Sequence, residues 1–145
     1  MFAGYIIYAI VVSDILDIAG LSFTVSDPVA ETLTLDSLFA LIFLMMGEEL
    51  FKFVPLMLLM RIIYKYSDNR KLSIIESALI VMICFGLLHW NPPYSTLVSA
   101  LFLQGFGTVF EMYGYIKTKN LFVPYLSHFF TDFIIKVVIL LGFVS

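Results

Sequence analysis

Long apolar runs separated by short polar segments make up most of the chain. A helix needs about 20 apolar residues to cross a bilayer, so this pattern predicts membrane helices. Segments rich in charge or proline, at 26–31, 65–71, 91–94 and 117–120, divide the runs, because proline disfavours helix at the residue before it. We predict five membrane helices, at residues 2–23, 35–64, 72–90, 95–115 and 121–144.

The composition supports an all-α, polytopic transmembrane helix bundle. Hydrophobic residues make up 61% of the chain and charged residues 13%, whereas soluble domains contain about 25% charged residues. We expect one transmembrane domain over residues 1–145, with a core at 36–144 that carries the polar residues of interest. A net charge of −3 gives no reason to expect a nucleic-acid partner, so membrane lipids are the expected surroundings.

The basic residues predict the orientation of the bundle. Lysine and arginine concentrate in the segments 65–71 and 117–120, and short basic loops favour the cytoplasmic side of a membrane. The chain is therefore expected in the cytoplasmic membrane, with its N-terminus inside and its C-terminus outside after five crossings.

Three charged residues interrupt the apolar run at 35–64. Glu48, Glu49 and Lys52 lie near its middle, where each charge costs roughly 2.5–3.5 kcal/mol on an insertion scale. Charged residues at this depth face a bundle interior or a wet cavity, and they indicate function. The helix at 35–64 is expected to present them to its neighbours.

The two histidines of the chain also lie in membrane segments. His89 ends the third segment, toward its outer end, and His128 lies near the start of the fifth. Residues four apart share a helix face, which pairs His128 with Asp132 and Glu48 with Lys52. We expect these polar edges to converge on an intramembrane cavity. Glu111 is expected nearer the inner end of the fourth segment, where it can line the cavity or face water and Lys117.

Such a cavity suits peptide hydrolysis by either of two routes. Two histidines and a carboxylate, here His89, His128 and Glu48, are a common ligand set for catalytic zinc, which makes a nucleophile of bound water. Alternatively, a glutamate in an apolar site deprotonates water with the help of a histidine. The second histidine then stabilises the oxyanion. The sequence leaves both routes open.

The order of these residues resembles the CPBP family of intramembrane proteases, which includes CAAX proteases and bacteriocin-processing enzymes and is also called Abi. The resemblance covers about 41–140. Its motifs EExxxR, FxxxH and HxxxN or HxxxD correspond to Glu48-Glu49, to Phe85 with His89, and to His128 with Asp132.

The resemblance implies an endopeptidase that cleaves a membrane-bound or prenylated peptide. It implies that Glu48 and His89 activate water, that His128 and Asp132 form an oxyanion or metal site, and that Glu49 supports the cavity. The arginine of the first motif would fall at Phe53; Lys52 stands one position earlier and gives EExxK, as in PrsW-type proteases. Lys52 is the expected counter-charge.

Two other classes of function remain open. A non-catalytic scaffold or a bacteriocin self-immunity protein could retain the protease fold, and it would tolerate loss of Glu48. An ion or proton pathway also uses carboxylates and histidines in membranes. A pathway should extend polar residues toward both faces, yet residues 137–144 are apolar, which disfavours it.

Overall fold

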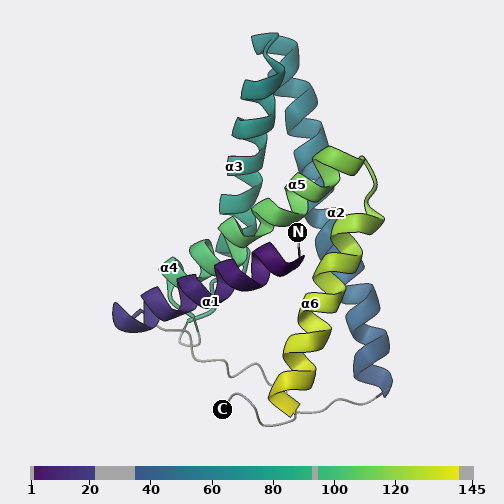
Figure 1. Cartoon of the computed structure of the whole chain (residues 1–145). Helices are drawn as coiled ribbons and strands as arrows, with labels where there is room; N and C mark the ends of the chain where they lie inside the picture. Colours follow the sequence, from purple (N-terminus) through teal and green to yellow (C-terminus); the bar gives the residue numbers. More distant parts are fainter. Residues whose placement is uncertain (1, 22–34, 93–94, 141–145) are drawn as a thin grey trace.

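The structure, a computed structural model, describes residues 2–21, 35–92 and 95–140, and every regular element in these ranges is helical (Figure 1). The predicted all-α architecture is confirmed. The elements are α1 Phe2–Ile18, α2 Leu35–Ser67, α3 Arg70–Leu88, α4 Leu97–Ser99, the π-helix η1 Ala100–Gly105, the 3₁₀-helix η2 Phe106–Thr108, α5 Val109–Thr118 and α6 Phe122–Leu140.

The described elements form five helical segments, because α4, η1, η2 and α5 follow one another without a break. Each segment overlaps one predicted membrane helix, and the boundaries differ by a few residues. The predicted ends at residues 23 and 144 lie outside the described ranges. By length and composition alone, α3 is the one described helix suited to cross a membrane. The helix α2 is longer, but Glu48, Glu49 and Lys52 interrupt its apolar sequence.

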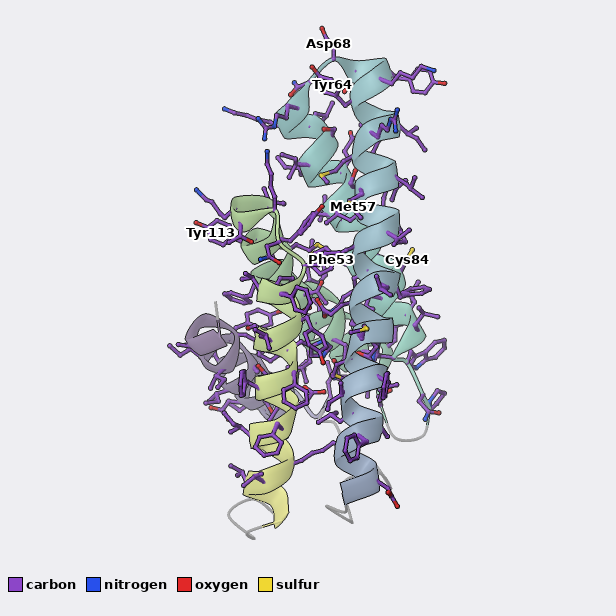
Figure 2. The ribbon with its side chains drawn as sticks, turned by 90° about the vertical axis from the view of Figure 1, so that its right-hand side faces the viewer. Phe53, Met57, Tyr64, Asp68, Cys84 and Tyr113 are labelled. Atoms are coloured by element: carbon purple, nitrogen blue, oxygen red, sulfur yellow. The ribbon has the colours of Figure 1, made fainter. Side chains whose placement is uncertain are left out.

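The helices α2 and α3 form an antiparallel hairpin that projects from the bundle (Figure 1). The turn contains Asp68 in the left-handed region, with φ at 48°. The next residue, Asn69, caps α3: its Oδ1 accepts a hydrogen bond from the Leu72 amide at 3.1 Å, as N-cap asparagines do. Tyr64 and Asp68 therefore lie at the far end of the hairpin (Figure 2).

The apolar core lies between α2, α3 and α5. Its buried members come from all three helices and exclude water from the lower part of the hairpin; they are Phe53, Leu56, Val81, Met82 and Met112. Many other apolar side chains point outward, among them Phe43, Leu58 and Ile75. Such an apolar exterior suits a helix bundle whose surroundings are lipid.

The segment that runs from α4 to α5 packs very closely on α3. A Cβ atom on Gly105 would lie 2.6 Å from the carbonyl oxygen of Met82, and one on Gly86 would lie 3.0 Å from the Cα of Leu101. Small residues allow membrane helices this approach. The Thr108 hydroxyl donates to the Gly105 carbonyl at 2.7 Å, which helps satisfy the backbone where the helix changes its winding.

Two further helices complete the bundle. The helix α6 packs against α5 and α2, while α1 lies across η1, α5 and α6 (Figure 1). The Tyr8 hydroxyl anchors α1 by donating to the carbonyl of Phe102 at 2.6 Å. Between α5 and α6 the chain reverses at Lys119, whose φ is 53°. This arrangement brings the middle of α2 close to the starts of α5 and α6.

Candidate active site

Charged side chains from three helices meet in the interior of the bundle. The helix α2 contributes Glu48, Glu49 and Lys52, α5 contributes Glu111, and α6 contributes His128 and Asp132. We call these six residues the polar cluster. It brings together all of the sequence-predicted site residues except His89 and Phe85, and it adds Glu111.

Lys52 is the cation at the centre of the polar cluster. Its side chain is 0% exposed and forms ion pairs with Glu49, one helical turn earlier, and with Glu111. Its ammonium also lies 4.9 Å from the centroid of the Phe85 ring, a cation–π distance. Two carboxylates and an aromatic face therefore replace the water that the ammonium loses. The expected role of Lys52 as counter-charge agrees with this geometry.

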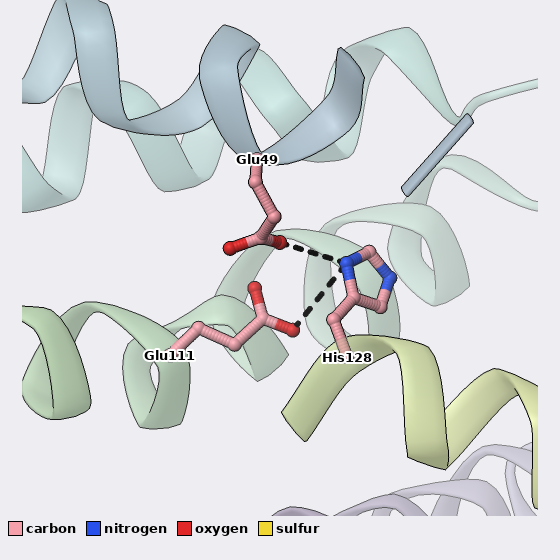
Figure 3. A group of neighbouring side chains, drawn as sticks. All are labelled: Glu49, Glu111 and His128. Atoms are coloured by element: carbon pink, nitrogen blue, oxygen red, sulfur yellow. Dashed lines mark hydrogen bonds and ion pairs between the residues drawn. The ribbon is translucent and has the colours of Figure 1, made fainter. Parts of the chain in front are cut away.

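Glu49 fixes the orientation of His128 (Figure 3). The Nδ1 atom of His128 lies 2.8 Å from Oε1 of Glu49 and 3.9 Å from Oε1 of Glu111. A carboxylate only accepts hydrogen bonds, so Nδ1 carries the proton and donates it to Glu49. Nζ of Lys52 is farther from Nδ1, at 3.3 Å, and already has two carboxylate partners. The opposite ring nitrogen, Nε2, is left to face the rest of the site.

Two carboxylates flank Nε2 of His128 on the more open side of the polar cluster. Oε2 of Glu48 and Oδ2 of Asp132 each lie 3.8 Å from it. The side chains of Glu48 and Asp132 are 25% and 31% exposed, against 5% for Glu49. A separation of 3.8 Å is too long for a direct hydrogen bond, but a water molecule can bridge Nε2 and either carboxylate.

His89 lies at the C-terminal end of α3, without a direct contact to the polar cluster among the described residues. Its Nδ1 atom donates to the carbonyl oxygen of Phe85 at 2.9 Å, and the two rings pack with centroids 4.4 Å apart. Within the described ranges it makes no hydrogen bond or ion pair to the cluster. Phe85 connects them, since its ring contacts both His89 and the Lys52 ammonium.

The donors that could hold a metal ion are already engaged with Lys52. One ligand atom each from Glu49, Glu111 and His128 lies within 4.8 Å of the other two. Lys52 contacts both of these carboxylates, so a metal ion there would have to displace a buried ammonium. The zinc ligands expected from the sequence were Glu48, His89 and His128, and the described contacts join Glu48 and His128 alone. The cluster as folded does not fit zinc, and we derive no step through a metal.

An apolar groove leads to the polar cluster from between α2 and α6. Its volume is about 180 Å³, and Glu49 is its one charged lining residue; the others are Met46, Leu50, Leu121, Phe122 and Tyr125. Oε2 of Glu49 is buried and has no hydrogen-bond partner among the described residues. The groove thus brings an apolar surface against the side chain of Glu49, next to the polar cluster.

Glu111 is the site residue for which the sequence left the position open. It lies in the first turn of α5, is 8% exposed and pairs with Lys52, which is 59 residues earlier. Of the two positions that the sequence left open, the structure shows Glu111 lining the cavity beside Lys52, and exposure to water and Lys117 is not observed. The available signal was electrostatic: a carboxylate inside a membrane segment needs a cation, and Lys52 and Lys136 are the two basic residues in the middle of apolar runs.

Comparison with known proteins assigns the chain to a family. No curated protein and no solved structure gives a significant match. A family model described as "Type II CAAX prenyl endopeptidase Rce1-like" matches residues 30–134, which is more than half of the chain and includes every residue of the polar cluster. This match confirms the CAAX-protease resemblance of the sequence motifs. The chain therefore belongs to the Rce1-like family of type II CAAX prenyl endopeptidases, which are membrane-embedded helical proteins.

Proposed function

We propose that this chain is an active intramembrane endopeptidase in which Glu48 activates the attacking water. The observation that carries the proposal is the two-sided environment of His128. Glu49 holds Nδ1 at 2.8 Å, while Nε2 faces Glu48 and Asp132 on the more open side. An imidazole with a fixed tautomer beside a partly exposed carboxylate is suited to orient and deprotonate water.

In the proposed reaction Glu48 carries one proton from the attacking water to the leaving nitrogen. A water between Glu48 and His128 donates one hydrogen bond to each, to the carboxylate and to the lone pair of Nε2. Its oxygen attacks the carbonyl carbon of the scissile bond as Glu48 takes the proton. Glu48 then returns the proton to the departing nitrogen, and the C–N bond breaks. A carboxylic acid and an amine are released, and the acid passes its proton to the amine to give a carboxylate and an ammonium. Glu49 keeps His128 in position through Nδ1.

The substrate class follows from the family and from the groove. The family model is described as a CAAX prenyl endopeptidase, and we propose a membrane-associated peptide with a prenylated cysteine as the substrate. The apolar groove between α2 and α6 supports this choice, because an apolar chain can approach Glu49 there without crossing a polar surface.

The test is cleavage of a prenylated CAAX peptide by the full chain in liposomes. A general base contributes roughly 10²–10⁴-fold, so Glu48→Gln should lower kcat by about that factor with the fold intact. Glu76→Gln is the matched control, because Glu76 is exposed on α3 outside the polar cluster. Undiminished cleavage by Glu48→Gln would refute the role of Glu48. A wild-type chain that cleaves no prenylated peptide would favour the scaffold or self-immunity alternative.

Mutating the two histidines in turn tests which of them works with Glu48: His128, which the structure places beside it, or His89, which the family motifs imply. If Glu48 works with His128, then His128→Ala should abolish cleavage, and His89→Ala should reduce it less. If His89→Ala alone abolishes cleavage, the pairing of Glu48 with His89 implied by the family motifs is correct. Metal content measured on the same wild-type preparation tests zinc directly; stoichiometric zinc whose removal stops cleavage would overturn the metal-free route.

A further inference from the structure

A second concentration of charge lies near the C-terminal end of α2, about three helical turns beyond the polar cluster. All lysines and arginines of the chain except Lys52 and Lys136 fall between Arg61 and Lys119. A cavity of about 380 Å³ opens there between α2, α3 and α5. We call it the basic pocket, and its lining residues are Met60, Arg61, Tyr64, Arg70, Ser73, Ile74, Tyr115, Ile116 and Lys119.

Three cations line the basic pocket without a compensating carboxylate. Arg61 comes from α2, Arg70 from the start of α3 and Lys119 from the end of α5, and no acidic residue is in the lining. Within the described ranges none of the three forms an ion pair. Three positive charges around one pocket attract an anion, and arginine in particular suits the oxygens of a phosphate group.

The rest of the basic pocket is apolar or aromatic. Met60, Ile74 and Ile116 provide the apolar part, and Tyr64 and Tyr115 supply rings with one polar end. A pocket for a free anion has no need of this apolar wall. A ligand that combines a phosphate with hydrocarbon chains would use both parts of the lining.

The depth of the basic pocket matches the phosphate level of a bilayer. Along α2, Asp36 lies thirteen residues before Glu49 and Arg61 lies twelve residues after it. At 1.5 Å per residue these are rises of about 20 and 18 Å. Half of the hydrocarbon core is about 15 Å thick. With Glu49 near mid-depth, Arg61 falls just beyond the hydrocarbon, where lipid phosphates lie; Tyr64 is one turn farther out (Figure 2).

We propose that the basic pocket binds the headgroup of an acidic phospholipid, with the upper part of its acyl chains against the apolar lining. Basic pockets between membrane helices at the headgroup level are suited to such lipids. A zwitterionic lipid offers the same phosphate, but its own ammonium meets the three cations of the pocket. The acidic lipid is therefore the preferred occupant.

The test compares two charge-matched triple variants of the full chain. The first, Arg61→Gln/Arg70→Gln/Lys119→Gln, removes the three pocket cations. The control, Lys65→Gln/Lys71→Gln/Lys117→Gln, removes three exposed cations from the same end of the molecule that do not line the pocket. Both lower the net charge by the same amount, so a general electrostatic attraction to anionic lipid falls equally in both.

Binding of phosphatidylglycerol to the purified protein in detergent is measured by native mass spectrometry, with phosphatidylcholine as reference. We expect the wild type to prefer phosphatidylglycerol and the pocket variant to lose affinity for it on the order of 100-fold. The control variant should stay within about threefold of the wild type. Equal losses in both variants, or no loss in either, would overturn the proposal.

Two further measurements cover a free anion as the ligand and a triple variant that fails to fold. If inorganic phosphate displaces phosphatidylglycerol at equal concentration, the ligand is a free anion and the lipid proposal fails. If the pocket variant does not fold, as judged by circular dichroism, the single variants Arg61→Gln and Arg61→Lys replace it. Arg61→Lys keeps the charge and should retain most of the binding that Arg61→Gln loses, and equal binding by the two would overturn the proposal.

Discussion

The polar cluster and the basic pocket lie on the same helix, and they treat charge in opposite ways. In the polar cluster the cation Lys52 is fully buried and contacts Glu49 and Glu111. In the basic pocket the cations Arg61 and Arg70 are exposed and have no ion-pair partner within the described ranges. One region satisfies its charges from within the protein, and the other leaves them available to a ligand.

Depth along α2 explains the difference. An ammonium surrounded by protein and hydrocarbon has no water to solvate it, so partners from other helices must do so. At the headgroup level, water and lipid phosphates are available, and a protein partner is unnecessary. Buried ion pairs are thus expected at the depth of the polar cluster, and unpaired cations at the depth of the basic pocket.

The largest expected contrast comes from removing one cation in each region. Lys52→Met leaves Glu49 and Glu111 buried without a counter-charge, and breaking a buried pair in this way costs about 3–5 kcal/mol. Arg61→Met should hardly change the free energy of unfolding, because Arg61 is exposed and unpaired in the described ranges. Denaturant unfolding in detergent micelles measures both. Equal stability of Lys52→Met and the wild type would mean that Lys52 does not pair with these carboxylates in the membrane.

A smaller effect is expected from Glu111, the acidic partner of Lys52 on α5. Glu111→Gln leaves Lys52 paired with Glu49 alone and should cost roughly 1–3 kcal/mol, the range for a lost hydrogen bond to a charged group. Cleavage should also fall, because Lys52 then holds Glu49 and His128 less firmly. The control is Glu76→Gln, and the readouts are the free energy of unfolding and kcat. A Glu111→Gln variant that matches this control in both would show that Glu111 is peripheral.

The smallest expected effect is a difference in how strongly salt weakens the interactions of the two regions. Raising the ionic strength from 0.1 M to 1 M shortens the Debye length from about 10 Å to 3 Å, and this screens exposed charges far more than buried ones. Binding of phosphatidylglycerol at the basic pocket should weaken severalfold. The difference in unfolding free energy between the wild type and Lys52→Met should stay nearly constant. If salt reduces that difference as well, water reaches the polar cluster.

Much of the candidate site could be predicted from the sequence, because a charged residue inside an apolar run is costly in a membrane unless it faces the bundle interior. Glu48, Glu49 and Lys52 stood out for that reason, and the four-residue spacing correctly placed His128 and Asp132 on one face. Helix existence was equally clear, since apolar runs of membrane length have a strong signal. Helix ends were less exact, and α2 continues to Ser67, beyond the predicted end at residue 64.

The partners of each polar residue could not be predicted in the same way. Pairing depends on which helices touch, and no local pattern connects Lys52 with Glu111 or Glu49 with His128. His89 illustrates the problem. It lies where α3 ends, and there its Nδ1 donates a hydrogen bond to the Phe85 carbonyl while the two rings pack together. The residue types therefore indicated which side chains form the candidate site, while the structure was needed to show which of them are in contact.

The π-helix η1 has a consequence for how the site tolerates changes in chain length. A π-turn holds one more residue than an α-turn, and each residue of an α-helix advances the facing direction by about 100°. Deleting one residue from Ala100–Gly105 would therefore return this stretch to regular winding while Glu111 keeps facing Lys52. Deleting Phe110 from the regularly wound start of α5 would instead turn Glu111 by about 100°, away from Lys52. The electrostatic balance of the site thus tolerates the loss of one residue in a segment that contributes no charge to it, and does not tolerate the same loss a few residues later.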